Sequence, residues 1–252
     1  MASSNPPTPI IRWPGGKRLM AKHVVPELPA HRIYCEPFGG GMAVLLAKAP
    51  SKVEVYNDLN GDLVNLFRVV KWHPTALGEE LSLMLNSREE YAAYKQEPGP
   101  TDLQRAARFL RSNHLSFGGI QGRGFACAGA TLSRSAVPAK VAALSARLDR
   151  VVIEHLDWRR CIALYDGPRT CFYLDPPYAD GDQHIYAHGF GEQDHRDLRT
   201  VLGGLDGQWV LSYGDHPLIR DLYRDCRIRE IQRTRTINNR ATKPYTELLI
   251  AA

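Results

Sequence analysis

The sequence has no apolar run that approaches the length needed to cross a bilayer, and it has no internal repeat. Residues 1–9 contain neither an apolar core nor a basic start, so we expect a disordered leader there rather than a signal peptide. The five cysteines are odd in number, scattered and without C-x-x-C spacing. The cysteine pattern predicts a protein that resides in a reducing compartment and has no structural disulfide and no zinc knuckle.

Several catalytic signatures are missing as well. The chain has no Gly-x-Ser-x-Gly elbow and no phosphate-binding Gly-Lys-Ser/Thr motif. His184 and His188 are four residues apart, with Asp194 and His195 nearby, which is a spacing that a metal site could use. The glycines at 189 and 191 argue against a rigid helical arrangement, and no cysteine is near. We therefore expect no metal.

Positive charge is concentrated in two segments of a chain whose net charge is +5. Residues 101–150 carry eight arginines and lysines against two aspartates, and residues 220–243 carry eight against three acidic residues. Such segments suit a polyanion, because the release of counterions favours binding and makes it sensitive to salt. On charge alone, a solvated basic face is an equally good interpretation.

Residues 32–60 have the pattern that opens a nucleotide-binding α/β sheet. A short apolar run at 32–35 ends in a glycine-rich turn at 36–41. Residues 42–49 are helical in character, and residues 52–56 alternate as a strand before the acidic end at Asp58. Strand, glycine turn, helix and strand in this order are typical of that sheet.

The alternation of strands and helices is then interrupted once. Residues 61–107 are mostly helical in period, and residues 117–130 are a glycine-rich stretch that suits a loop or a tight hairpin. We expect strands at 151–155, 172–178 and 209–213, helices at 161–165, 192–202 and 217–223, and final strands at 227–237 and 245–250, joined by 238–240. The predicted fold class is α/β: a Rossmann-like, mostly parallel sheet with an antiparallel C-terminal hairpin, formed by residues 1–60 and 151–252. Residues 61–150 are predicted to be an inserted, mainly helical lobe.

The most informative motif is Asp175-Pro176-Pro177-Tyr178, at the end of the apolar run 170–174. The carboxylate can accept a hydrogen bond from an exocyclic amino group, and the tyrosine can stack on a flat heterocycle. The prolines hold a backbone carbonyl outward as a second acceptor, because proline fixes φ and has no N–H. Two acceptors on an aromatic amine bias its nitrogen toward a tetrahedral shape and bring out its lone pair. The plain alternative is a strand end followed by a Pro-rich turn.

Other segments could hold a ligand, and each has a structural alternative. The turn at 36–41 could bring backbone close to a ligand or merely join a strand to a helix. Asp58 could hold ribose hydroxyls or cap a helix. Residues 12–18, with Trp13 and Lys17, could lie along a small charged ligand or pack on the sheet as an N-terminal arm. Asp157 and Trp158 could hold an adenine, or they could be a capping aspartate and a buried tryptophan.

These motifs, in this order, resemble those of the Dam-like (alpha-group) DNA adenine N6-methyltransferases. Residues 12–18 resemble the N-terminal Lys/Arg-Trp-x-Gly-Gly-Lys motif, 36–44 the methyl-donor turn, 57–60 the second donor motif and 175–178 the catalytic tetrapeptide. Residues 109–119 resemble the Phe-Asn-Gly segment that leads to the target-recognition region, and 235–250 the closing strands. Met42 departs from the last glycine of the donor turn, Gly118 from a common asparagine and Trp158 from a phenylalanine.

The resemblance implies an enzyme that transfers a methyl group from S-adenosylmethionine to N6 of an adenine flipped out of double-stranded DNA at specific sites. Because the sequence has no obvious exposed apolar stripe, we expect a monomer, and we expect it in the cytoplasm of a bacterial or phage-infected cell. The implied catalytic residues are Asp175, Pro176, Pro177 and Tyr178. The implied cofactor-binding residues are Trp13, Lys17, Glu36, Pro37, Phe38, Gly39, Gly40, Gly41, Asp58, Asp157, Trp158 and Asp175. The residues expected to contact DNA are Arg111, Arg123, Arg134, Arg235 and Asn239.

Two alternatives remain open at the level of the sequence. A related methyltransferase with the same donor site could act on cytosine N4, on adenine in RNA or on a protein amide, because such enzymes differ in the target lobe. A DNA-binding, repressor-like module that has lost catalysis is the second alternative. The intact tetrapeptide and donor motifs argue against it.

Overall fold

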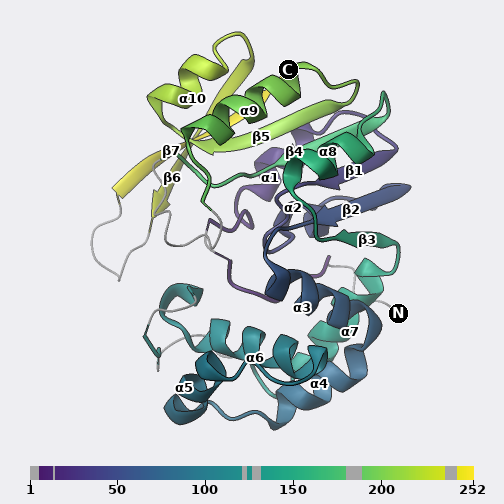
Figure 1. Cartoon of the computed structure of the whole chain (residues 1–252), viewed down its shortest axis with the longest axis vertical. Helices are drawn as coiled ribbons and strands as arrows, with labels where there is room; N and C mark the ends of the chain where they lie inside the picture. The colour runs from purple at the N-terminus through teal and green to yellow at the C-terminus, as the bar shows by residue number, and fades with distance from the viewer. Residues whose placement is uncertain (1–5, 14, 121–123, 127–131, 180–188, 236–242) are drawn as a thin grey trace.

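The computed structural model describes residues 6–13, 15–120, 124–126, 132–179, 189–235 and 243–252. Its centre is a seven-stranded sheet with the strand order β3-β2-β1-β4-β5-β7-β6 (Figure 1). The first five strands in this order are parallel, and β7 is antiparallel to both β5 and β6. The predicted α/β class, the mostly parallel sheet and the antiparallel C-terminal pair are confirmed.

The strand bounds follow the apolar runs closely. The parallel strands are β1 (Ile33–Glu36), β2 (Val53–Asn57), β3 (Val151–Glu154), β4 (Thr170–Leu174) and β5 (Gln208–Gly214). The C-terminal pair is β6 (Arg227–Arg235) and β7 (Lys243–Ala251). The expectation that the fourth strand extends to Tyr178 was wrong. It ends at Leu174, because Pro176 and Pro177 have no N–H with which to continue the ladder.

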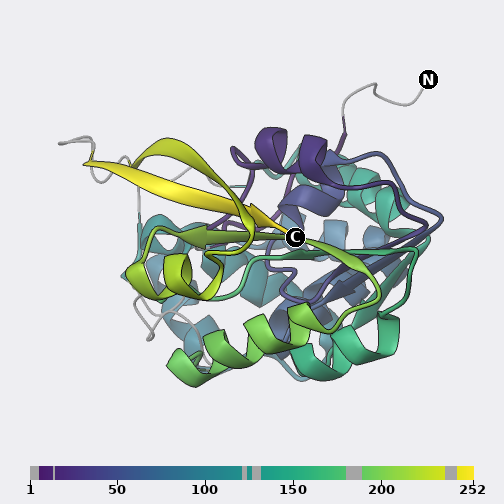
Figure 2. The same cartoon turned by 90° about the horizontal axis from the view of Figure 1, so that it is seen from above.

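Helices cover both faces of the sheet. One face carries α1 (Ala21–Val24), the 3₁₀ turn η1 (Val25–Glu27) and α2 (Ala43–Ala47), and the other carries α8 (Trp158–Tyr165), α9 (Glu192–Gly203) and α10 (Pro217–Leu222). Figure 2 shows this sandwich from above, with the purple helices on one side of the sheet and the green ones on the other. No helix in the described ranges is long and apolar enough to cross a membrane.

The described residues between β2 and β3 are mainly helical, whereas the separate lobe predicted for residues 61–150 stays a prediction. This segment contains α3 (Gly61–Trp72), α4 (Pro74–Leu83), α5 (Arg88–Gln96), α6 (Asp102–Leu115), the 3₁₀ turn η2 (Phe117–Gly119) and α7 (Val137–Leu148). These helices gather below the sheet in Figure 1. Three of them begin at side-chain caps, which are Asn60, Ser87 and Thr101.

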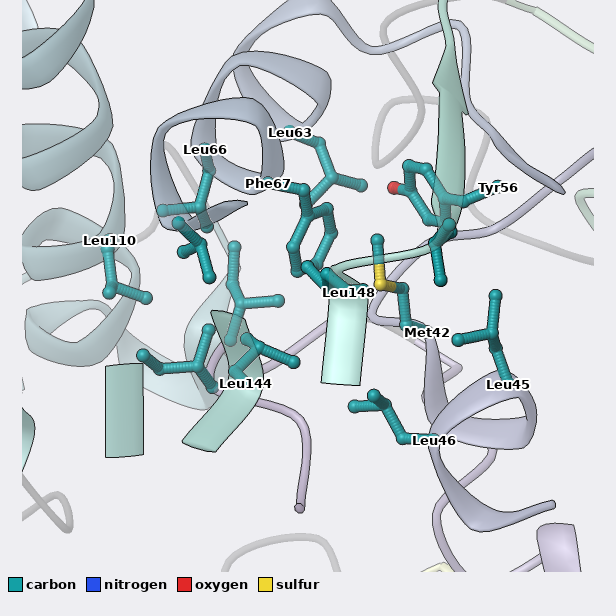
Figure 3. Packing of buried hydrophobic residues seen from close by; sticks show 14 of the residues in the cluster. Met42, Leu45, Leu46, Tyr56, Leu63, Leu66, Phe67, Leu110, Leu144 and Leu148 are labelled. Atoms are coloured by element: carbon teal, nitrogen blue, oxygen red, sulfur yellow. The ribbon is translucent and has the colours of Figure 1, made fainter. Parts of the chain in front are cut away.

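Among the described residues, this helical segment shares one hydrophobic core with the sheet. Leu63 and Phe67 of α3 and Leu148 of α7 belong to the same buried cluster as Met42 and Tyr56 from the sheet region (Figure 3). All five side chains are fully buried. The inserted segment is therefore fixed to one face of the sheet by continuous hydrophobic packing.

A buried ion cluster adds a polar link between the same parts. Glu54 of β2 accepts hydrogen bonds from both terminal nitrogens of Arg147 on α7 and from Lys48 after α2. Arg147 also donates to the backbone oxygen of Leu45, at 2.7 Å. Only 3% of the Glu54 side chain is exposed. One carboxylate thus pairs with two buried or nearly buried cations that come from two different helical regions.

We expect Glu54→Gln to lower the free energy of unfolding by roughly 3–5 kcal/mol, because Lys48 and Arg147 would retain buried charges without their carboxylate. Urea denaturation at neutral pH measures the change. Glu79→Gln, at an exposed position of α4, is the matched control and should stay within about 0.5 kcal/mol. A loss for Glu54→Gln no larger than that of the control would contradict this role.

Candidate functional site

Several of the predicted site residues meet where the parallel strands end. A cavity of about 170 Å³ is lined by residues that follow β1, β2, β3 and β4, together with Trp13 from the N-terminal segment. Its wall includes Phe38, Gly40, Asp58, Asp157, Trp158 and Asp175. The carboxyl ends of parallel strands share one edge of a sheet, and this edge is where α/β proteins bind ligands.

The glycine turn after β1 is shaped by close contacts. A Cβ atom on Gly39 would lie 2.2 Å from the Tyr56 ring, and one on Gly40 would lie 2.8 Å from Trp13. Gly40 has a positive φ of 47°, which glycine adopts without strain. Met42 also has a positive φ, of 60°, and this explains why a glycine is common at its position. Gly39 and Gly41 shape the turn, while Gly40 is the glycine of the turn that lines the cavity.

Asp58 fixes this turn to the end of β2. Its two carboxylate oxygens accept hydrogen bonds from the backbone N–H groups of Gly40 and Asn60, both at 2.8 Å. Asn60, not Asp58, caps α3, because its side chain accepts from Leu63 N. The helix-cap alternative for Asp58 is therefore wrong. Its carboxylate lines the cavity, and an ionised carboxylate can accept about four hydrogen bonds.

The far wall of the cavity is aromatic. Trp158, Phe38 and Phe190 pack against one another with ring centroids 5.8–6.3 Å apart. Asp157 caps α8 through Arg159 N, which confirms the structural interpretation, and it also lines the cavity, so the adenine-binding role of the Asp157-Trp158 pair stays a prediction. Arg159 lies over the Trp158 ring at 4.2 Å. It also holds α9 against α8 through Asp194 and Asp197, at 2.9 and 2.6 Å.

Asp175 lines the cavity, and two neighbouring side chains bind its carboxylate. Its Oδ1 accepts from Lys17 Nζ at 2.8 Å and from Ser212 Oγ at 3.0 Å. Burial raises the pKa of Asp175 above its ordinary value, although Lys17 acts in the opposite direction. Burial alone would lower the pKa of Lys17, but Asp175 and Glu247 offset burial and raise it. Lys17 is therefore a protonated ammonium at neutral pH.

Tyr178 is anchored through its hydroxyl. It donates to Glu247 Oε1 at 2.6 Å, and Lys17 Nζ lies 4.8 Å from the centroid of its ring. Burial would raise the pKa of Glu247, but Lys17, Tyr178 and Arg233 outweigh burial and lower it. Sequence reasoning missed Glu247, Ser212, Phe190 and Arg159 as parts of the site, because they join it through strand pairing and helix packing.

Glu36 was predicted among the cofactor-binding residues, but it does not line the cavity. It is the last residue of β1, is 2% exposed and accepts a hydrogen bond from Tyr34 OH at 2.7 Å. Pro37 and Phe38, the next two residues, do line the cavity. The side chain of Glu36 is therefore buried beside Tyr34 rather than exposed to the cavity.

The residues predicted to contact DNA are placed differently from one another. Arg111 is fully buried in α6 and donates to the backbone oxygen of Leu81 and to Asn86 Oδ1, so its prediction as a DNA contact was wrong. Arg134 is exposed and donates to Ser82 O at 2.5 Å. Arg235 ends β6, and its side chain is outside the described part. Arg123 and Asn239 lie outside the described residues, as do His184 and His188.

Comparison with known proteins gives one family. The family of D12 class N6 adenine-specific DNA methyltransferases matches residues 13–237. A type II methyltransferase from Lactococcus lactis subsp. cremoris is 29% identical, over 96% of this chain and 94% of its own. A retron DNA adenine methylase from Escherichia coli is 26% identical (95% and 90%), and a DNA adenine methylase from Vibrio cholerae is 24% identical (96% and 94%).

The buried carboxyl of Glu36 should make the free energy of unfolding depend on pH. Burial raises the pKa of Glu36 from 4.5 to about 8. The stabilisation by neutral Glu36 is therefore complete below pH 4.5 and is lost as the pH rises toward 8. Glutamine cannot ionise. Between these two pH values the free energy of unfolding of Glu36→Gln should therefore fall less steeply with pH than that of the wild type, and the two slopes should differ by up to about 1.4 kcal/mol per pH unit. Urea denaturation of both proteins across this range measures the two slopes, and equal slopes would contradict the prediction.

Proposed function

Because the chain belongs to the D12 class N6 adenine-specific DNA methyltransferases and methylates adenine N6 in DNA, we propose that it takes the methyl group from S-adenosylmethionine and acts on a base flipped out of the duplex. The family description names DNA adenine, which favours this substrate over cytosine N4, RNA or a protein amide. One observation supports the proposal most: the Asp175 carboxylate lies in the wall of the cavity that the glycine turn, Asp58 and Trp158 also line.

The residues of the cavity fit S-adenosylmethionine. The missing Cβ at Gly40 lets backbone form the cavity wall beside Trp13, which suits the methionine end of the donor. Asp58 has the acceptor oxygens that ribose hydroxyls need, and Asp157 with Trp158 offers an acceptor beside an indole for the adenine. When bound, this donor supplies an activated methyl group on a positively charged sulfur.

The tetrapeptide then acts on the target amine. We assign Asp175 and the carbonyl of Pro176 as acceptors for the two N6 hydrogens, with Pro177 fixing the backbone and Tyr178 stacking on the base. Asp175 also accepts the proton that leaves N6 once that nitrogen has been alkylated. Burial makes it a better proton acceptor than an exposed aspartate, because its pKa is raised. This chemistry depends on positioning and needs no covalent enzyme nucleophile.

We assign the helical segment at 61–150 as the lobe that recognises DNA. Extruding a base costs a few kcal/mol, and contacts to phosphates offset part of that cost. The segment carries partly or fully exposed cations on α6 and before α7, among them Arg105, Arg108 and Arg134. Arg111 is excluded from this set because it is buried. The lobe's fixed packing on the sheet gives these cations a defined place relative to Asp175.

Replacing Asp175 by Ala should abolish methyl transfer, a loss of at least about 10²–10⁴-fold, because both the hydrogen-bond acceptor and the proton acceptor disappear. Donor affinity should remain within a few-fold. Transfer of a labelled methyl group to DNA, followed by analysis of the nucleosides, measures the first quantity, and quenching of intrinsic tryptophan fluorescence measures the second. Asp206→Ala, at an exposed position, is the control. Methylated DNA from the Asp175 variant would refute the assigned role.

Replacing Arg123 and Arg134 together by Ala should weaken binding to DNA and reduce the slope of log affinity against log salt by about one for each phosphate that is no longer neutralised. Arg160→Ala removes an exposed cation from α8, outside the lobe, and should leave the slope unchanged. Titration of labelled duplex at several salt concentrations measures both. If the double variant kept the wild-type affinity and slope, a surface other than this lobe would bind the DNA.

A further inference from the structure

Glu247 is a buried carboxylate that contacts the predicted catalytic residues from β7, the last strand of the chain. It lies in β7, paired with Gly214 of β5 and Ile231 of β6, and it is 1% exposed. Its Oε1 accepts hydrogen bonds from Tyr178 OH at 2.6 Å and from Lys17 Nζ at 3.2 Å. Its Oε2 accepts from Arg233 at 2.7 Å. Both oxygens are therefore engaged, and one of them touches two residues of the site.

The hydrogen bonds of Lys17 are fully assigned. An ammonium has three N–H donors, and those of Lys17 reach the backbone oxygen of Gly15 at 2.9 Å, Asp175 at 2.8 Å and Glu247 at 3.2 Å. The cluster contains two carboxylates, Asp175 and Glu247, and two cations, Lys17 and Arg233. Its charge is balanced, which a buried site requires.

We propose that Glu247 is a positioning residue for methyl transfer, which fixes the Tyr178 ring through its hydroxyl and shares Lys17 with Asp175. This inference rests on the proposed function and assigns a role in it to a residue outside the tetrapeptide and the donor turn. Tyr178 has one hydroxyl donor and gives it to Glu247, so the carboxylate restrains the ring on which the target base stacks. By taking one donor of Lys17, Glu247 also keeps that cation from pairing with Asp175 alone.

Glutamine at this position cannot replace the carboxylate. Its amide has one acceptor oxygen and one NH₂ donor, so either Arg233 or the pair of Tyr178 and Lys17 would face a donor. The loss of the negative charge would also draw Lys17 toward Asp175. Because the charge of Glu247 raises the pKa of Asp175, Glu247→Gln should lower that pKa and move the acidic limb of the pH–rate profile to lower pH. A role confined to stability would not move this limb.

The experiment compares four variants of the full-length chain with the wild type: Glu247→Gln, Tyr178→Phe, the double variant, and Glu230→Gln as control. Glu230 lies in β6, is exposed and pairs with Arg220, so it matches the chemistry without touching the site. Single-turnover transfer from labelled S-adenosylmethionine to DNA free of N6-methyladenine is measured across pH. Donor affinity is measured by tryptophan quenching, and thermal unfolding is recorded for each variant.

We expect Glu247→Gln to reduce the single-turnover rate on the order of 10–100-fold, with donor affinity within two-fold of the wild type and the acidic limb at lower pH. Tyr178→Phe keeps the ring and should lose several-fold in rate. The double variant should be no slower than Glu247→Gln, because both changes remove the same hydrogen bond. Glu230→Gln should match the wild type.

Three results would overturn the inference: a Glu247→Gln rate within two-fold of the wild type, additive losses in the double variant, or a rate loss with an unshifted limb and an equal loss of donor affinity. If Glu247→Gln does not fold, Tyr178→Phe decides, and wild-type transfer by that variant overturns the inference. A wild-type chain that methylates no DNA would instead refute the proposed function. The two failures are therefore distinguishable.

Discussion

The adjacency of β1 and β4 is the constraint on which the site depends. Ile33 lies opposite Val53 of β2 on one side and opposite Thr170 of β4 on the other. The order of the chain therefore reverses at β1, and the turns after β1 and β4 open at the same edge without a helix between them. The glycine turn and the Asp175 tetrapeptide, about 135 residues apart in sequence, become two walls of one cavity. A donor molecule and a target amine can meet only if those walls are neighbours.

Burial of charge gives this cavity its chemistry. The Asp175 side chain is only 21% exposed, and an unpaired carboxylate that is largely removed from water is strongly destabilised. Lys17 and Ser212 compensate by hydrogen bonding to one of its oxygens. Glu247 binds the same ammonium, which is therefore shared between two carboxylates. One oxygen of Asp175 is thus held by Lys17 and Ser212, and 21% of the side chain remains exposed beside the cavity.

The sequence predicted what is local and missed what depends on distant pairing. Val53, Val55 and the apolar residues of 170–174 identify their strands, and Asp175 and Gly40 identify the site, because these signals lie within a few residues. Glu247 joins Tyr178 only through the register of β7 against β5, across nearly 70 residues. Arg111 is a cation in a basic segment, which is typical of a DNA contact, but the packing of α6 against α4 buries it. No count of charges separates a buried guanidinium from an exposed one.

The N-terminal segment links the helical lobe to the cavity. The side-chain amide of Asn113 in α6 makes two hydrogen bonds with the backbone of Arg12. Its Oδ1 accepts from Arg12 N at 3.0 Å, and its Nδ2 donates to Arg12 O at 2.7 Å. The same Nδ2 donates to Gly119 O at 2.6 Å, in the turn that follows α6. Trp13, the next residue after Arg12, packs on Gly40 and lines the cavity. A displacement of the helical segment at 61–150 would therefore reach the glycine turn after β1 through two adjacent residues, Arg12 and Trp13.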